Sequence, residues 1–214
     1  MKKVLMIAVM WLPVAAMAQN DWEVPDKVET TTTSTTGTTT AAAIPNPDAK
    51  YLTGAVPVKD GKVVFEQTIN APGKSADQIY DILLDLVERM ARGGNQSEQS
   101  RVVIQDKEKH QIVADFYEWL VFTNKALVLD RTHLRFYLII NCEDGKATAE
   151  MTRISYLYEE ERDPQRYTAE EWITDEECMN KEHTKLFRMN GKFRRKTIDR
   201  KDFIFNKLEE ELNK

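Results

Sequence analysis

The sequence predicts an α+β domain, in which an antiparallel sheet of about five strands carries helices on one face. Three patterns support this fold class. Apolar residues alternate with period two on both sides of one segment that has helical spacing. An Asp-Gly pair stands between two strand-like runs and predicts a β-hairpin. The last third of the chain returns to helical spacing, so the expected order is strand, helix, four strands, a helical insert and a last helix.

The first strand is expected over residues 62–70, "KVVFEQTIN", and the first helix over residues 75–92, "SADQIYDILLDLVERMAR". The helical segment is followed by a Gly-Gly pair, which is a natural stop. Ser75 and Gln78 form an S-x-x-Q capping box, in which each side chain satisfies an N–H group at the start of the helix. Ser75 is therefore expected to be a structural N-cap.

The turn between this strand and helix, "INAPGKSAD", also resembles the end of a phosphate-binding loop. The complete motif needs a glycine where this chain has Thr68, and Pro72 has no N–H to offer a phosphate. We therefore interpret the stretch as a turn and not as a nucleotide site.

Four strands are expected next, as an antiparallel meander through "RVVIQD", "QIVADFYEWLVF" and the two arms around Asp144-Gly145. A two-residue turn at that pair places Cys142 opposite Ala147 and Leu138 opposite Met151. This register matches apolar residues across the hairpin, which favours it.

Two helix starts are expected after the sheet. The first is Thr174 to Glu177, which reads as a capping box, and the second is Asp199 to Asp202. The last helix then has an apolar side that includes Phe205.

The N-terminus has the pattern of a cleaved secretory signal peptide over residues 1–18: Lys2 and Lys3, an apolar run and an Ala-Met-Ala site. The mature chain is expected to be periplasmic or secreted, with no transmembrane anchor. Its net charge would be about −7, against −5 for the full chain, and an exported acidic chain is not expected to bind nucleic acid. Residues 19–54 contain "TTTTSTTGTTT" and are expected to form a disordered tether, either plain or O-glycosylated. Residues 55–214 form the single α+β domain.

The stretches "VPVKDGKVVFEQTINAPGKSADQIYD" and "NGKFRRKTIDRKDFIFNKLEEEL" resemble an exported Bacteroidota family of unknown function, described as having a TATA-binding-protein-like fold. The resemblance covers about residues 56–212. It implies an antiparallel sheet with two helices on one side, and an envelope or secreted location in a Gram-negative bacterium. It implies no known activity, and the fold name does not imply DNA binding, because function belongs to sites rather than to folds.

The two cysteines, Cys142 and Cys178, allow two interpretations. Export would place them where a disulfide can persist and stabilise the domain. The alternative is a pair of small buried thiols, and the spacing of the two residues does not decide between them.

No pattern indicates a catalytic site, a metal site or a cofactor. There is no G-x-S-x-G motif, and the three histidines (His110, His133 and His183) lie far apart in the sequence. Cys178 and His183 do not have a standard zinc spacing. We therefore expect a protein that is not an enzyme and that carries no metal or cofactor.

The sheet face away from the helices is the candidate binding site. If the apolar hairpin pairs face the helices, Tyr137 and Ile139 face away, and alternation places Tyr117 and Trp119 together on one side of the preceding strand. Aromatic side chains on an otherwise open face suit a ligand or a partner protein. The alternative is that the tether, the insert or a second subunit covers them.

Charge is unevenly distributed in the last third of the chain. Residues 159–177 hold nine acidic side chains against two basic ones, and residues 181–201 hold nine basic against two acidic. These are either solvated faces that attract each other or a docking surface whose binding would weaken with salt.

We therefore expect an exported binding or interaction module of the bacterial cell envelope, with an envelope protein as its partner. The alternative is a carrier of a small apolar ligand held between sheet and helices. The sequence leaves the oligomeric state and the identity of the partner open.

Overall fold

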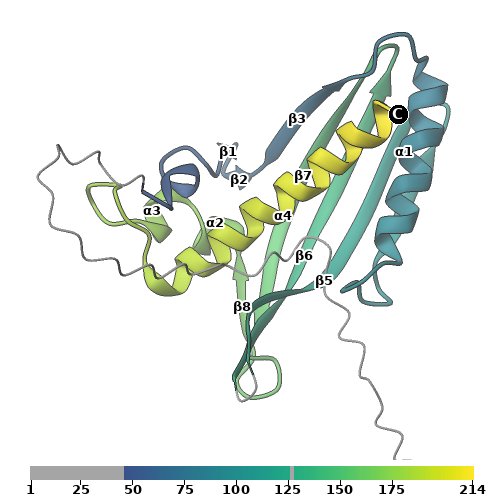
Figure 1. The fold of residues 1–214 in the computed structure, drawn as a ribbon. Coiled ribbons are helices and arrows are strands. Elements are labelled where there is room, and N and C mark those ends of the chain that lie inside the picture. Colours follow the sequence, from purple (N-terminus) through teal and green to yellow (C-terminus); the bar gives the residue numbers. More distant parts are fainter. Residues whose placement is uncertain (1–45, 126–127) are drawn as a thin grey trace, which may run out of the picture.

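The computed structural model describes residues 46–125 and 128–214. Its centre is a six-stranded antiparallel sheet in the order β3-β7-β6-β5-β4, with β8 paired to β7 (Figure 1). The strands are β3 (Phe65–Asn70), β4 (Arg101–Asp106), β5 (Gln111–Lys125), β6 (Val128–Glu143), β7 (Lys146–Tyr158) and β8 (Gln165–Thr168). A separate pair, β1 (Val58–Lys59) and β2 (Lys62–Val63), precedes them. The helices are η1 (Ala49–Tyr51), α1 (Ala76–Ala91), α2 (Ala169–Trp172), α3 (Asp175–Cys178) and α4 (Arg188–Leu212).

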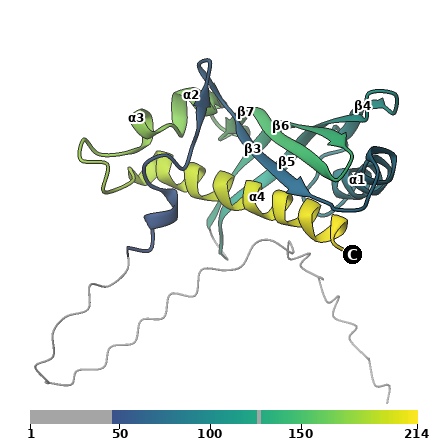
Figure 2. The ribbon, with the colours of Figure 1, turned by 90° about the horizontal axis from the view of Figure 1, so that it is seen from above.

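Both long helices, α1 and α4, lie on the same face of the sheet (Figures 1 and 2). α4 crosses the strands obliquely, and α1 packs against the β4, β5 and β6 side. The predicted α+β class, with an antiparallel sheet and helices on one face, is confirmed. The predicted four-strand meander is also confirmed, as β4-β5-β6-β7. We call the face opposite α1 and α4 the open face.

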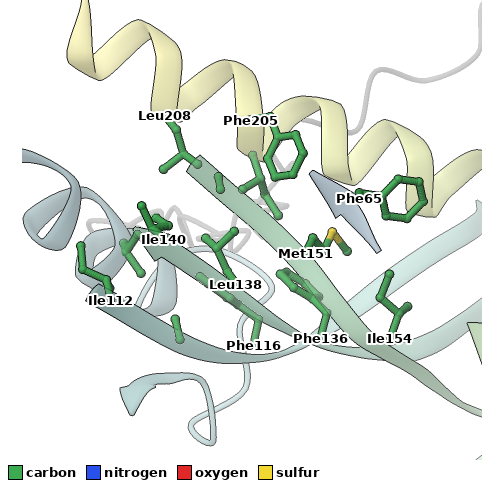
Figure 3. Close-up of a cluster of buried hydrophobic side chains, with 14 of the residues drawn as sticks. Phe65, Ile112, Phe116, Phe136, Leu138, Ile140, Met151, Ile154, Phe205 and Leu208 are labelled. Carbon is green, nitrogen blue, oxygen red and sulfur yellow. The ribbon is translucent and has the colours of Figure 1, made fainter. Parts of the chain in front are cut away.

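The core lies between the sheet and these two helices (Figure 3). Alternate residues of the central strands point into it and are fully buried, as Phe116, Phe136 and Leu138 show. They pack on buried residues of α1, such as Leu83, and of α4, such as Phe205. Burying side chains of this size contributes about 1.5 to 3 kcal/mol each, so this layer supplies most of the stability of the domain.

One ion pair is buried inside the same layer. Arg200 of α4 donates from Nε and Nη2 to Glu118 of β5 at 2.6 and 2.8 Å, and both side chains are at least 95 % buried. Gln96 donates to the same carboxylate. A bidentate contact of this kind fixes where α4 lies on the sheet, because either charge alone would be costly in the interior.

The start of α1 forms as predicted. Ser75 accepts a hydrogen bond from the Gln78 N–H, and the Gln78 side chain accepts from the Ser75 N–H. Lys74 donates from Nζ to the carbonyl of Leu212 at 2.7 Å, at the C-terminal end of α4. The residue that suggested a phosphate loop therefore binds the negative end of a helix.

The register of the β6–β7 hairpin also agrees with the sequence. Leu138 pairs with Met151 and Cys142 with Ala147, around the turn at Asp144 and Gly145. Gly145 has a φ of +77°, the left-handed conformation that glycine adopts without strain.

Two expectations about the starts of helices were wrong, one of them only in part. A helix does start at Thr174, which is the N-cap of α3, but the Thr174 side chain makes no capping hydrogen bond; the box forms instead at Thr168 and Glu171, before α2. Asp199 to Asp202 is not a helix start, because α4 already begins at Arg188. Gly191 lies in the first turn of α4 and leaves room for Leu186. A Cβ added at position 191 would lie only 2.9 Å from the Cβ of Leu186.

Residues 46–54, which were expected to belong to the tether, have a defined place in the structure. Residues 1–45, with the expected signal peptide and most of the tether, lie outside the described residues. Residues 46–54 pack on α4: Asp48 accepts two hydrogen bonds of 2.6 Å from Arg195, and Arg194 donates to the carbonyls of Tyr51 and Leu52. Basic residues of α4 therefore hold this segment, which apolar patterning alone does not reveal.

The two cysteines are not bridged. Cys142 and Cys178 are both free and buried, so the alternative of two buried thiols is correct and the disulfide is not. The two cysteines lie at opposite ends of α4. Cys142 is beside the β6–β7 hairpin, near the C-terminal end of the helix, and the carbonyl of Cys178 accepts a hydrogen bond from the N–H of Phe187 at its N-terminal end. A helix of 25 residues spans about 37 Å, far beyond disulfide reach. Burial raises the pKa of the Cys142 thiol to about 12.

Candidate functional site

The four candidate binding residues lie together on the open face. In β5, Tyr117 pairs with Arg135 of β6, and Trp119 pairs with His133. In β6, Tyr137 pairs with Asp115 of β5, and Ile139 pairs with Val113. All four candidates are half-buried, whereas their neighbours in sequence on the covered face are fully buried. The alternation used to select them was therefore correct.

Four side chains form a continuous stack across β5 and β6, which we call the aromatic stack: Tyr117, His133, Trp119 and Arg131. The His133 ring lies parallel to Tyr117 with centroids 4.3 Å apart, and it stacks on Trp119 at 3.5 Å. The Arg131 guanidinium lies 3.7 Å from the Trp119 ring centroid. Stacking and cation–π contacts hold these rings in one fixed arrangement without removing them from the surface.

His133 is the most buried member of the stack, at 8 % exposed. In the neutral tautomer with a proton on Nε2, it donates to Glu160 at 3.0 Å. Its Nδ1 is then a buried acceptor, and it has no hydrogen-bond partner among the described residues. Desolvation by burial, with a smaller contribution from Arg131, holds the pKa of His133 below its usual value despite Glu160. Burial of the ring therefore favours the neutral imidazole.

Further arginines lie beside the stack. Arg135 donates from Nε and Nη2 to Asp115 at 3.0 and 2.7 Å, and the hydrogen bond to this buried carboxylate raises the pKa of the guanidinium. Arg153 lies 5.7 Å from the Tyr137 ring and has a φ of 52°, at the irregularity where the β6–β7 register shifts. The open face thus presents tyrosine, tryptophan and arginine side chains that are already oriented.

Two surface grooves flank the stack. One, of about 450 Å³, is lined by Trp119 and Arg131, and the other, of about 600 Å³, by Tyr117 and Arg135. Leu157 and Glu160 line both grooves. Glu160 belongs to the loop of residues 159–164 between β7 and β8, which we call the strap. The strap therefore borders both grooves at Glu160.

Sequence reasoning missed Arg131, His133 and Arg135, although a signal was present. All three have the same parity in β6 as Tyr137, so the same alternation assigns them to the open face. Strap residue Glu160 gave no comparable signal, because its contact with His133 joins residues that are distant in sequence.

The residues that the structure describes contain neither a metal-binding cluster nor a membrane-spanning helix. No group of three His, Cys, Asp or Glu side chains there is placed to hold a metal ion. No helix there is both long and apolar enough to cross a membrane.

Comparison with known proteins identifies the family of the chain. Residues 65–157 match the model of a domain of unknown function, DUF4468, with TBP-like fold. A crystal structure of a DUF4468 family protein from Bacteroides ovatus ATCC 8483 is 38 % identical, with a TM-score of 0.74, and the match covers 79 % of this chain and 96 % of that one. A TBP-like protein from Parabacteroides distasonis ATCC 8503 is 20 % identical, with a TM-score of 0.61, over 74 % of this chain and 97 % of that one; this match concerns the fold. No protein of curated function matches. The chain therefore belongs to the DUF4468 family, whose function is unknown and whose fold is TBP-like.

Proposed function

We propose that the protein is an exported, non-catalytic interaction module of the bacterial cell envelope that binds a partner protein through its open face. The observation that carries this proposal is the aromatic stack of Tyr117, His133, Trp119 and Arg131, which is ordered by its own contacts and lies on the sheet face that neither α1 nor α4 covers. Rigid aromatic rings lose little conformational entropy on binding. Most of the free energy gained by burying them against a partner therefore contributes to the affinity.

The composition of the face favours a protein as the partner. Tryptophan, tyrosine and arginine dominate the energetic centres of protein interfaces. Here they come from three adjacent strands: Tyr117 and Trp119 from β5, Arg131 and Tyr137 from β6, and Arg153 from β7. Export is proposed from the signal-peptide pattern of residues 1–18.

A carrier of a small apolar ligand receives less support. Such a ligand would lie between the sheet and the helices, and the fully buried side chains of the core fill this space, as Phe116, Phe136 and Phe205 illustrate (Figure 3). The grooves beside the stack are open and lined by charged residues.

In-cell photocrosslinking tests the proposal. A photoreactive phenylalanine analogue at position 137 lies on the open face, and the same analogue at position 206, where Asn206 is exposed on α4, is the matched control. We expect one defined protein adduct at position 137 and none at position 206. An adduct only at position 206, or the same adducts at both positions, would contradict the proposal. An adduct between two copies of this chain would identify the partner as a second subunit.

A further inference from the structure

The strap carries three consecutive acidic residues, Glu159 to Glu161, and two of them contact members of the aromatic stack. Glu160 accepts from His133 at 3.0 Å, and Glu161 accepts from Arg131 at 3.1 Å. Resting on the proposed function, we infer that the open face binds an acidic polypeptide segment of the partner, and that the strap occupies the place of this segment in the free protein.

The geometry of the grooves supports this inference. The strap borders both grooves at Glu160, and Leu157 also lines both. Moving Glu160 away from His133 would join them into one trough along β5, β6 and β7. An extended chain could then lie across the stack, with its carboxylates at the positions that Glu160 and Glu161 now fill.

The charges and hydrogen-bonding groups of the trough also suit an acidic segment. Arg131 and Arg135 line its two halves, and Arg166 of β8 lines the larger groove without an ion-pair partner among the described residues. The unpartnered Nδ1 of His133, in a side chain 10 % exposed, would gain a donor from a backbone N–H of the incoming chain.

The strap is held weakly enough to be displaced. The side chain of Glu161 is 80 % exposed and that of Glu160 is 44 % exposed, so water screens both contacts. Glu159 has a φ of 54°, a conformation that a residue with a Cβ adopts at a cost. A competing segment therefore has little to overcome, and its apparent affinity equals its intrinsic affinity multiplied by the fraction of molecules in which the strap is open.

The test is fluorescence anisotropy of a labelled octaglutamate peptide with the exported, purified protein. The double substitution Glu160→Gln and Glu161→Gln removes the charges of the strap, and Glu176→Gln with Glu177→Gln, an exposed pair on α3, removes the same charge elsewhere. We expect the strap variant to bind the peptide about fivefold more tightly than the control variant. Adding Arg131→Gln to the strap variant should reverse this gain. Thermal unfolding of each variant confirms that it is folded.

Equal affinity of the strap and control variants would overturn the inference, because net charge alone would then explain any binding. The photocrosslinking result separates this failure from failure of the proposed function. If position 137 yields a partner whose affinity the strap substitutions leave unchanged, the interaction module stands and the acidic segment does not. If position 137 yields no partner and the peptide does not bind, both proposals fail.

Discussion

The two faces of the central strands differ in how their side chains are satisfied. On the covered face, Phe116 and Phe136 stack on each other with centroids 5.0 Å apart and are fully buried. On the open face, the next residue along each strand, Tyr117 or Tyr137, is half-buried and has a charged or imidazole group on its ring. Adjacent residues therefore differ in role: the covered set holds the domain together, and the open set keeps its rings at the surface, where the proposed partner would contact them.

The ion pairs of the two faces show the same difference. Glu118 and Arg200 are buried with nearly ideal geometry, whereas Arg131 and Glu161 have side chains that are 31 % and 80 % exposed. A buried pair is costly to break because one charge is left without compensation, and an exposed pair contributes little. The covered face thus fixes α4, while the contacts of the strap can be exchanged.

The largest expected effect comes from truncating adjacent residues on the two faces. Phe136→Ala should lower the free energy of unfolding by about 3 to 5 kcal/mol, because it leaves a cavity in the core. Tyr137→Ala should lower it by about 1 kcal/mol or less, because its ring is half-exposed. Urea unfolding measures both values. Equal losses would mean that the open face also holds the domain together.

The next effect comes from the buried ion pair. Glu118→Gln should cost about 3 kcal/mol, because it leaves the guanidinium of Arg200 buried beside a neutral amide. Glu161→Gln, its counterpart on the open face, should cost less than about 1 kcal/mol. Thermal unfolding of the two variants decides the comparison, and a small loss for Glu118→Gln would show that Arg200 finds another partner.

A smaller effect is expected at the helix that completes the covered layer. Ser75→Ala should cost about 1 kcal/mol, because it removes the side-chain bond to the Gln78 N–H. Thr174→Ala is the matched control, since the Thr174 hydroxyl makes no capping hydrogen bond to α3 and donates only at 3.4 Å to the Glu170 carbonyl, and it should cost only a few tenths of a kcal/mol. If the two losses were equal in urea unfolding, the capping box would contribute nothing measurable.

The smallest effect is a pH dependence on the open face. His133 packs between the rings of β5, with Glu160 of the strap and Arg131 of β6 as its charged neighbours, and desolvation lowers its pKa from 6.5. The unfolded chain therefore binds a proton more readily than the folded one, and stability should fall as the pH falls below about 6.5. His133→Gln should reduce the dependence of stability on pH in the range between the folded-state and the unfolded-state pKa of His133. An unchanged slope in unfolding experiments from pH 7.5 to pH 5 would show that another group causes it.

Local signals in the sequence predicted much of the fold. A two-residue turn sets the hairpin register, and the capping box at Ser75 involves residues three apart. The start of α4 could not be predicted in this way. Asp199 and Asp202 look like residues at the start of a helix, but they lie in the middle of α4. There they form ion pairs with Lys50, which is 149 residues away from Asp199 in the sequence.

The candidate site could be predicted only in part for the same reason. Alternation assigned Tyr117, Trp119, Tyr137 and Ile139 to one face, but the sequence between β5 and β6 has no turn signal like Asp144-Gly145 from which their register could be predicted. That register brings His133 onto Tyr117 and Trp119. The strap contact depends on it in turn, because Glu160 meets His133 only after the sheet has formed.

The central claim, that the open face binds the partner while the covered face stabilises the domain, is tested most directly by the affinity of the crosslinked partner for Tyr137→Ala. Isothermal titration with the purified partner should show a loss of tenfold or more, about 1.4 kcal/mol, as expected at the centre of an interface. The unfolding midpoint of the variant should stay close to that of the wild type. An unchanged affinity in this folded variant would contradict the claim.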